Sequence, residues 1–252
     1  MKIAIWGAGV VGQATGEGFA RLGHEVYTLD KDPKRCKFPW SLWPDRDTNR
    51  HLDFVFFCVP ETAIKEALYQ CNLKRGIWVI RSSTTPGTIE SLSKSINRPL
   101  LHNPEFLRAA TALQDFLTPN YILIGAQRAG DAVPLQRLYE PFGVPMITTN
   151  IKVTEMVKLA TNSYLATVIA YWNDISELCK KLGISSHEVG IIASHDPRLV
   201  SYASHMHNRY GGTCLPKDIV QLLTLAETLN VDVPVLEGVN FWSEWSKEEA
   251  KT

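Results

Sequence analysis

Cys214 has the surroundings of a reactive thiol, in the segment Gly211-Gly212-Thr213-Cys214-Leu215-Pro216-Lys217-Asp218. Pro216 favours the first helical position of a predicted helix that runs to Leu229, which places Cys214 at or beside the N-cap. Helix-end amides and the neighbouring Lys217 favour the thiolate, which is the nucleophilic form of cysteine. The alternative is a buried structural cysteine in a tight turn, but glycines and a lysine around a core cysteine have little packing purpose.

Three further segments carry groups that could bind or activate a substrate. They are Ser82-Ser83-Thr84-Thr85-Pro86-Gly87-Thr88, Asn103-Pro104-Glu105-Phe106-Leu107-Arg108 and Glu155-Met156-Val157-Lys158-Leu159-Ala160-Thr161-Asn162. The first two follow predicted strands, at the sheet edge where open α/β folds place their ligands. Lys158 and Asn162 are four residues apart on a predicted helix, so both project from one face and suit a substrate oxygen. Such a pair on its own is more often part of a solvated helix surface.

A nucleotide site is indicated by the turn after the first predicted strand. Its three glycines have the spacing of a dinucleotide-binding turn, in the run Gly7-Ala8-Gly9-Val10-Val11-Gly12. The first glycine permits the tight turn, the second lets backbone amides approach a pyrophosphate at the helix N-terminus, and the third lets helix and strand pack closely. Asp30 ends the second predicted strand, 18 residues after Gly12, and is placed to accept hydrogen bonds from a ribose. Its carboxylate repels a 2′-phosphate and favours NAD over NADP, although the adjacent Lys31 weakens that preference; the alternative is a glycine-rich turn without a nucleotide.

The elements that must position these groups follow from the pattern of apolar residues. Residues 2–149 alternate β-rich runs with helical stretches, which predicts a parallel sheet with helices on both faces. The expected strands are Ile3–Trp6, Glu25–Leu29, Phe54–Val59, Trp78–Arg81, Leu100–His102, Tyr121–Gly125 and Pro145–Thr148. After Asn150 the pattern is helical, with one long helix over Val153–Leu182 stopped by Gly183 and shorter helices near 185–194, 216–229 and 233–249. We therefore predict an α/β protein, with a Rossmann-type doubly wound parallel sheet over residues 1–149 and a mainly α-helical domain over 150–252.

Composition excludes several classes of partner. The 26 lysines and arginines equal the 26 acids, so no basic face is available for nucleic acid or an anionic membrane. No apolar run approaches the about 20 residues of a membrane helix, and the N-terminal glycines come too early for a signal peptide. The five cysteines contain no CxxC pair and are typical of a reduced, cytoplasmic protein. His205 and His207 are two residues apart with no third ligand at a matching spacing, so we expect no metal site.

Taken together, the motifs resemble those of the UDP-glucose/GDP-mannose dehydrogenase family, the nucleotide-sugar 6-dehydrogenases. The resemblance runs from Met1 to about Glu237 and rests on GxGxxG, a serine/threonine run ending in PGT, NPEFLR, ExxKxxxN and GGxCLPKD. It implies that NAD takes a hydride twice from C6 of the sugar. The first step turns the alcohol into an aldehyde, and the second turns a cysteine thiohemiacetal into a thioester that water hydrolyses to the uronic acid.

The same resemblance implies a role for each reactive residue. Cys214 would form the thiohemiacetal and the thioester. Lys158 would stabilise the oxyanion at C6, and Asn162 would help to position it. Asp218 would pair with Lys158 and orient water, and Glu105 would be the general base for hydrolysis.

Four features depart from the family pattern. Ser83 stands where the family has its catalytic-site threonine, which keeps the hydroxyl but loses the methyl that restricts the rotamer. Ala109 replaces a second glutamate of the NPEFLR segment. Arg209 replaces a glycine, which places a bulky cation near the substrate ring and points to an unusual or anionic substrate. The stretch between Asp30 and Phe54 is short and contains Trp40 and Trp43.

The C-terminal part of the chain also differs from the family. The chain stops at Thr252, after a helix that in relatives leads into a third domain, so the nucleotide-binding third domain is expected to be absent. The last predicted helix carries Phe241, Trp242 and Trp245 at helical spacing, an aromatic patch that could pack on its own lobe, pair two subunits or receive a partner. We expect a homodimer formed through the helical domain, because relatives dimerise there and two-fold pairing is the commonest oligomer.

Two other functions remain open on the sequence. One is a two-electron hydroxyacid dehydrogenase, which shares the Rossmann lobe and a helix with lysine and asparagine but uses no cysteine. The other is a non-catalytic NAD-binding subunit that needs a partner for the missing domain. Retention of the five reactive residues with implied roles argues against the second of these.

Overall fold

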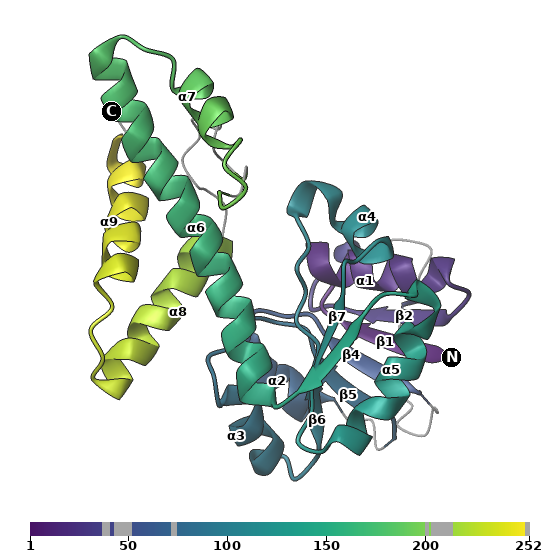
Figure 1. Cartoon of the computed structure of the whole chain (residues 1–252). Coiled ribbons are helices and arrows are strands. Elements are labelled where there is room, and N and C mark those ends of the chain that lie inside the picture. The colour runs from purple at the N-terminus through teal and green to yellow at the C-terminus, as the bar shows by residue number, and fades with distance from the viewer. Residues whose placement is uncertain (37–40, 43–51, 72–74, 200–201, 203–213, 250–252) are drawn as a thin grey trace. The chain divides into compact units, whose positions relative to one another are not determined.

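The computed structural model describes residues 1–36, 41–42, 52–71, 75–199, 202 and 214–249 (Figure 1). The chain divides into two compact units, Met1–Lys158 and Leu159–Thr252. Trp40, Trp43, Arg209, His205 and His207, which the sequence singled out, lie outside the described residues.

The first unit is built on one sheet with the strand order β3-β2-β1-β4-β5-β6-β7-β8. The strands are β1 Lys2–Trp6, β2 Glu25–Leu29, β3 Ser41–Leu42, β4 Phe54–Phe57, β5 Ile77–Ile80, β6 Leu100–His102, β7 Ile122–Gly125 and β8 Met146–Thr149. β4 and β7 are buried along their whole length, as expected for continuous apolar runs in a sheet covered on both faces. All seven predicted strands are confirmed to within two residues at each end, and β3 is a further strand of two residues.

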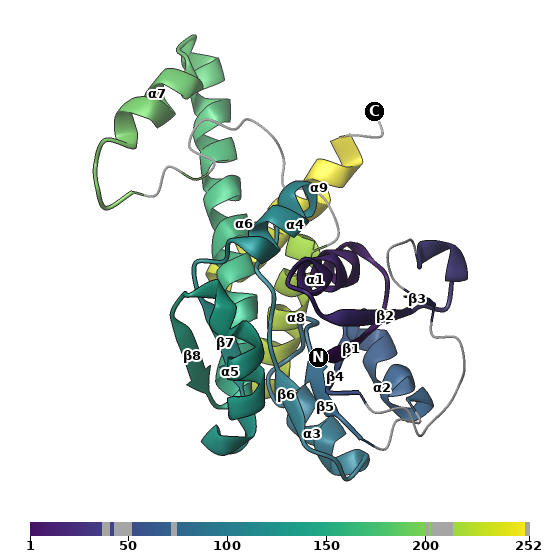
Figure 2. The same cartoon turned by 90° about the vertical axis from the view of Figure 1, so that its right-hand side faces the viewer.

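Helices cover both faces of this sheet (Figures 1 and 2). The helices of the first unit are α1 Val10–Arg21, α2 Glu61–Gln70, α3 Thr88–Ser95, α4 Ala112–Leu117 and α5 Val133–Tyr139, with short 3-10 turns at Pro33–Arg35, Ala109–Thr111, Ala129–Ala132 and Glu140–Phe142. One core cluster contains Phe19 of α1, Phe116 of α4 and Leu135 of α5. The other contains Ile64 of α2 and Ile89 of α3. The predicted doubly wound arrangement is therefore confirmed.

The predicted parallel sheet is confirmed except at one junction. β6 pairs with β7 in the antiparallel sense, through the single pair His102–Gly125, whereas every other neighbouring pair is parallel. His102 and Gly125 are the last residues of their strands, so β6 and β7 pair only where their carboxyl ends meet. Alternation of strands and helices does not report strand direction, which depends on the edge from which the chain returns.

The second unit is helical and begins within α6, Ile151–Leu182, which is followed by α7 Ser186–Ala193, α8 Cys214–Leu229 and α9 Pro234–Glu249. Its core joins Ala166, Ile169 and Trp172 of α6 to Ile219 of α8 and Val239 of α9. No helix in the described ranges combines the length and apolar character needed to cross a membrane.

Local chemistry explains where these helices begin and end. Gly183 ends α6 with a φ of +66°, a conformation that glycine adopts without steric cost. The Ser185 side chain caps α7 by accepting a hydrogen bond from the Glu188 amide. α8 begins at Cys214 rather than at the predicted Pro216. Pro216 is the third residue of α8, and proline fits in the first turn because the amides of that turn have no partner within the helix.

Candidate active site

The glycine turn leaves space at the start of α1. A Cβ on Gly12 would lie 1.8 Å from the Gly7 carbonyl oxygen, and Gly7 itself has a φ of +102°. A Cβ on Gly9 would meet nothing within 4 Å. Gly9 is the N-cap of α1 and no side chain caps that helix, so the first amides, beginning with those of Val10 and Val11, face a site that suits a pyrophosphate.

Asp30 lies beside this turn, at the carboxyl end of β2. Its Oδ2 accepts a hydrogen bond from the Ala8 amide at 2.7 Å, and its Oδ1 accepts one from the Asp32 amide at 2.9 Å. Each carboxylate oxygen can accept a second hydrogen bond, so a ribose hydroxyl fits. The neighbouring Lys31 is exposed.

Lys158 is a buried cation paired with Glu105. The lysine is 4% exposed, its Nζ lies 3.3 Å from Glu105 Oε1, and it lies 5.2 Å from the ring centroid of Phe106. Glu105 Oε2 accepts a hydrogen bond from the Leu107 amide at 2.7 Å. This pair therefore places a fixed cation and a carboxylate together beyond the end of β6.

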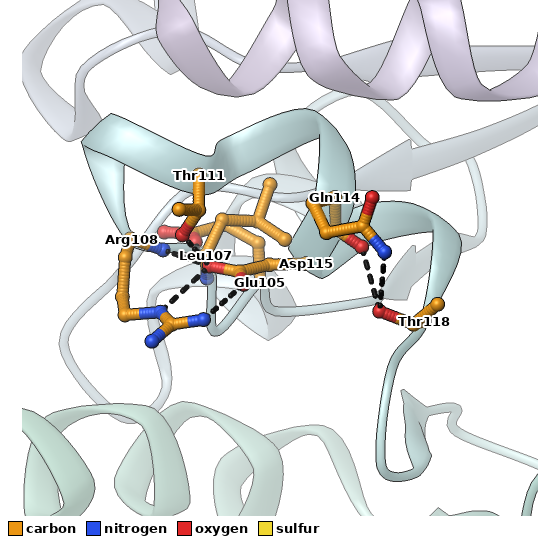
Figure 3. Close-up of polar contacts among 7 residues, drawn as sticks. All are labelled: Glu105, Leu107, Arg108, Thr111, Gln114, Asp115 and Thr118. Carbon is orange, nitrogen blue, oxygen red and sulfur yellow. Dashed lines mark hydrogen bonds and ion pairs between the residues drawn. The ribbon is translucent and has the colours of Figure 1, made fainter.

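Arg108 and Asp115 form an ion pair at the surface, just after Glu105 in the chain. We call this pair, together with Thr111, the surface clasp (Figure 3). Asp115 of α4 accepts hydrogen bonds from the Arg108 amide at 2.8 Å, from Arg108 Nε at 3.1 Å and Nη2 at 2.6 Å, and from Thr111 Oγ1 at 2.9 Å. Hydrogen bonding from Arg108 holds the pKa of the Asp115 carboxyl well below its usual range. Sequence reasoning missed this clasp, because the two partners are seven residues apart across an irregular turn.

Glu155 anchors the serine/threonine run that contains Ser83. It is fully buried, and accepts hydrogen bonds from Thr84 Oγ1 at 3.0 Å, from the Gly87 amide at 2.6 Å and from the Ile89 amide at 3.0 Å. Burial raises the pKa of Glu155 despite these bonds. The carboxylate thus fastens α6 to the start of α3, and the half-buried Ser83 lies next to this anchor.

His102 is a second buried link between α6 and the same run. Its Nδ1 lies 2.7 Å from Thr154 Oγ1 and its Nε2 lies 3.3 Å from the Ser82 carbonyl oxygen. Burial lowers the pKa of His102 to about 3, so the ring is neutral at physiological pH. We therefore assign it a structural part.

The reactive residues of the second unit gather around Asp218. This carboxylate is fully buried, accepts a hydrogen bond from Asn162 Nδ2 at 2.5 Å and binds the amine of Lys217, which also donates to Gln221 Oε1 at 2.9 Å. Cys214, the first residue of α8, is exposed one turn before Asp218. Asp218 thus compensates the charge of Lys217.

The structure thus pairs four of the six candidate catalytic residues, two in each unit. Lys158 pairs with Glu105 in the first, and Asn162 with Asp218 in the second. The expected pair between Lys158 and Asp218 joins the two units and stays a prediction. Among the described residues, no group of three or more histidine, cysteine, aspartate or glutamate side chains is arranged to hold a metal.

Family models match both units of the chain. Residues 46–143 match the model described as "UDP-glucose/GDP-mannose dehydrogenase family, NAD binding domain", and residues 152–242 match the central domain of that family. Residues 2–87 also match a model described as "NADP oxidoreductase coenzyme F420-dependent", which covers the glycine turn and Asp30.

Curated relatives agree with these matches. The chain is 30% identical to a UDP-glucose 6-dehydrogenase of Rickettsia typhi and 29% identical to one of Bacillus subtilis, over 95% of its own length but only 66% and 65% of theirs. It therefore spans about two thirds of the length of the curated relatives it matches.

Two solved structures share the fold. A UDP-glucose dehydrogenase of Pyrobaculum islandicum has a TM-score of 0.88 at 24% identity, over 97% of this chain and 68% of that one. A 3-hydroxyisobutyrate dehydrogenase of Mycobacterium tuberculosis has a TM-score of 0.81 at 13% identity, over 98% of this chain and 94% of that one.

Proposed function

Because the chain belongs to the UDP-glucose/GDP-mannose dehydrogenase family, we propose that it is an NAD-dependent dehydrogenase that oxidises the C6 alcohol of a nucleotide sugar to a carboxylate. The observation that carries this proposal is the ion pair between the buried Lys158 and the partly buried Glu105. Glu105 follows the carboxyl end of β6 and Lys158 lies on α6. The same sheet carries the glycine turn that suits NAD. The cation suits stabilisation of an oxyanion, and the carboxylate suits removal of a proton from a hydrolytic water.

Bound NAD would accept one hydride in each of two oxidations. In the first oxidation the C6 alcohol loses a hydride and a proton and becomes an aldehyde, and Lys158 stabilises the developing alkoxide with Asn162 as a further donor. The Cys214 thiolate then adds to the aldehyde carbon, and the resulting thiohemiacetal loses the second hydride and becomes a thioester.

Hydrolysis completes the reaction. Glu105 takes a proton from water, the water oxygen bonds to the thioester carbon, and the carbon–sulfur bond breaks to release Cys214 and the carboxylate product. Asp218 holds Asn162 through the 2.5 Å hydrogen bond and helps to orient water. The sum is one alcohol, one water and two NAD⁺ converted to one carboxylate, two NADH and three protons.

A homodimer formed through α6 is part of the proposal. Tyr164, Tyr171 and Leu178 recur every seven residues along α6 and are 53%, 56% and 61% exposed. An apolar row at that spacing suits the pairing of two helices. None of the five cysteines, all within the described residues, forms a disulfide, which favours a cytoplasmic protein.

NADH production by the purified chain against a panel of UDP- and GDP-hexoses tests the function. We expect turnover with at least one of them, and loss of about 10²–10³ in kcat for Lys158→Met, by analogy with removal of one oxyanion donor. Lys152→Met is the matched control, because Lys152 lies on α6 but pairs with Glu90 at the surface. No turnover with any nucleotide hexose, or equal activity of the two variants, would overturn the proposal.

A further inference from the structure

Arg81 is a buried cation that the proposed chemistry does not use. It directly follows β5, is 4% exposed, and takes part in none of the ion pairs among the described residues. Its Nη1 donates to Asn103 Oδ1 at 2.5 Å and to the Tyr139 hydroxyl at 2.8 Å, while its Nε has no hydrogen-bond partner. A buried guanidinium without an acid is costly. Besides these two neutral partners, it has only the ring of Phe116 among the described cation–π contacts, with 5.7 Å to the ring centroid.

Asn103 is held on several sides by buried groups. Besides the bond from Arg81, its Oδ1 accepts one from the Tyr139 hydroxyl at 2.7 Å. Its Nδ2 donates to the Leu123 carbonyl oxygen at 2.8 Å, and its backbone amide donates to the Ile80 carbonyl oxygen at 2.8 Å. Asn103 thus connects β5, β7 and α5, through its backbone amide to Ile80 and its side chain to Leu123 and Tyr139.

That point is the weakest junction of the sheet. β6 and β7 share one registered pair, whereas β4 and β5 share four and β7 and β8 share four. Backbone pairing alone therefore fixes the spacing of β6 and β7 poorly. Asn103 directly follows His102, the β6 member of the single pair. Its side-chain bond to the Leu123 carbonyl oxygen links the two strands where they make no further backbone pair.

We propose that Arg81, Asn103 and Tyr139 form a buried triad that replaces the missing ladder bonds between β6 and β7 and thereby sets the position of Glu105. Glu105 is two residues beyond Asn103, and only Pro104, whose φ is fixed by its ring, separates them. Displacement of Asn103 consequently displaces the carboxylate that faces Lys158.

The electrostatic surroundings of Cys58 agree with this arrangement. Burial raises the pKa of the Cys58 thiol to about 12, while the charge of Arg81 opposes that rise and the charge of Glu105 adds to it. Both charges therefore act on the thiol of the half-buried Cys58, which directly follows β4. Arg81 and Asn103 are positioning residues here, since they act through Glu105 and not on the substrate.

Hydrogen exchange of the Tyr139→Phe protein tests the triad without any substrate. The variant removes the hydroxyl that bonds both Arg81 and Asn103 but keeps the buried ring. We expect about tenfold faster exchange in peptides covering 100–108 and 119–126, as loss of about two hydrogen bonds implies. Tyr69→Phe is the matched control, because Tyr69 is 56% exposed on α2. Equal exchange in the two variants would overturn the triad.

Turnover by the same variant tests the link to Glu105, and this part alone rests on the proposed function. We expect kcat to fall about tenfold with an unchanged KM for the nucleotide sugar, because a misplaced base slows hydrolysis and not binding. Arg81→Lys, which keeps the charge but loses the planar fork, should show the same split. Faster exchange with an unchanged kcat would overturn the positioning of Glu105. A wild-type chain that makes no NADH would refute the function and leave the exchange result to decide the triad.

Discussion

Replacement of Glu155 by glutamine tests whether this buried carboxylate fastens α6 to the serine/threonine run. Glutamine has one acceptor oxygen where the carboxylate has two, so it cannot accept from both Gly87 and the pair formed by Thr84 and Ile89. Losing one hydrogen bond to a charged group costs about 1.5–3 kcal/mol, and an orphaned buried donor costs about 1–3 kcal/mol. Relief of the charge burial offsets part of this.

We therefore expect Glu155→Gln to lower the free energy of unfolding by about 2 kcal/mol, or the melting temperature by about 4–8 °C. Scanning calorimetry measures this against Glu66→Gln, a matched change at an exposed position of α2. If the two variants melt together, the anchoring role of Glu155 is refuted.

The stability deficit of Glu155→Gln should change with pH in a direction that the pKa of Glu155 predicts. Burial raises the pKa of Glu155 above its usual value of 4.5, so the folded protein binds that proton more tightly than the unfolded chain. Tighter proton binding by the folded state adds to the free energy of unfolding. This contribution is complete below the usual pKa and is lost as the pH rises through the raised pKa. Glu155→Gln lacks this titration, so its deficit against the wild type should be larger near about pH 4 than at about pH 7. A deficit that grows toward neutral pH would contradict the assignment.

Three further substitutions probe the cofactor turn and the surface clasp. Gly12→Ala should unfold or strongly destabilise the first unit, by about 3 kcal/mol or more, because its Cβ meets backbone at 1.8 Å. Gly9→Ala should keep the melting temperature and weaken NAD binding in calorimetric titration, and equal melting temperatures for the two would contradict the packing described. Asp115→Asn should cost less than about 1 kcal/mol, since the clasp is at the surface. Because hydrogen bonding from Arg108 lowers the pKa of Asp115, that cost should be present above the usual pKa of 3.8 and vanish as the pH falls through the lowered value; a cost that persists in acid would exclude this role.

The sequence predicted the positions of elements better than their directions. Glycine spacing and apolar runs located β1, α1 and the strands that follow, because these patterns are local. The two-residue β3 is too short to produce a pattern, and the reversal at His102 and Gly125 depends on the path of the whole connection. Residue types therefore predicted the Rossmann class but not the antiparallel junction between β6 and β7.

At the site, the sequence predicted which residues are reactive better than which residues they contact. Cys214 was expected at a helix start from its glycines and proline, and α8 does begin there. The pairing of Lys158 with Glu105 spans 53 positions in the sequence and depends on where α6 meets the sheet edge. Arg81 gave no signal, because an arginine after a strand usually reaches solvent.

The stoichiometry of NADH per nucleotide sugar is the most direct test of the central claim. In single-turnover reactions of an active nucleotide hexose with excess NAD, we predict two NADH and one uronate per sugar. A thioester on Cys214 should be detectable by mass spectrometry when hydrolysis is slowed. The Cys214→Ser protein should produce no uronate. One NADH per sugar, or full activity of Cys214→Ser, would contradict the thioester mechanism and favour a simple two-electron dehydrogenase.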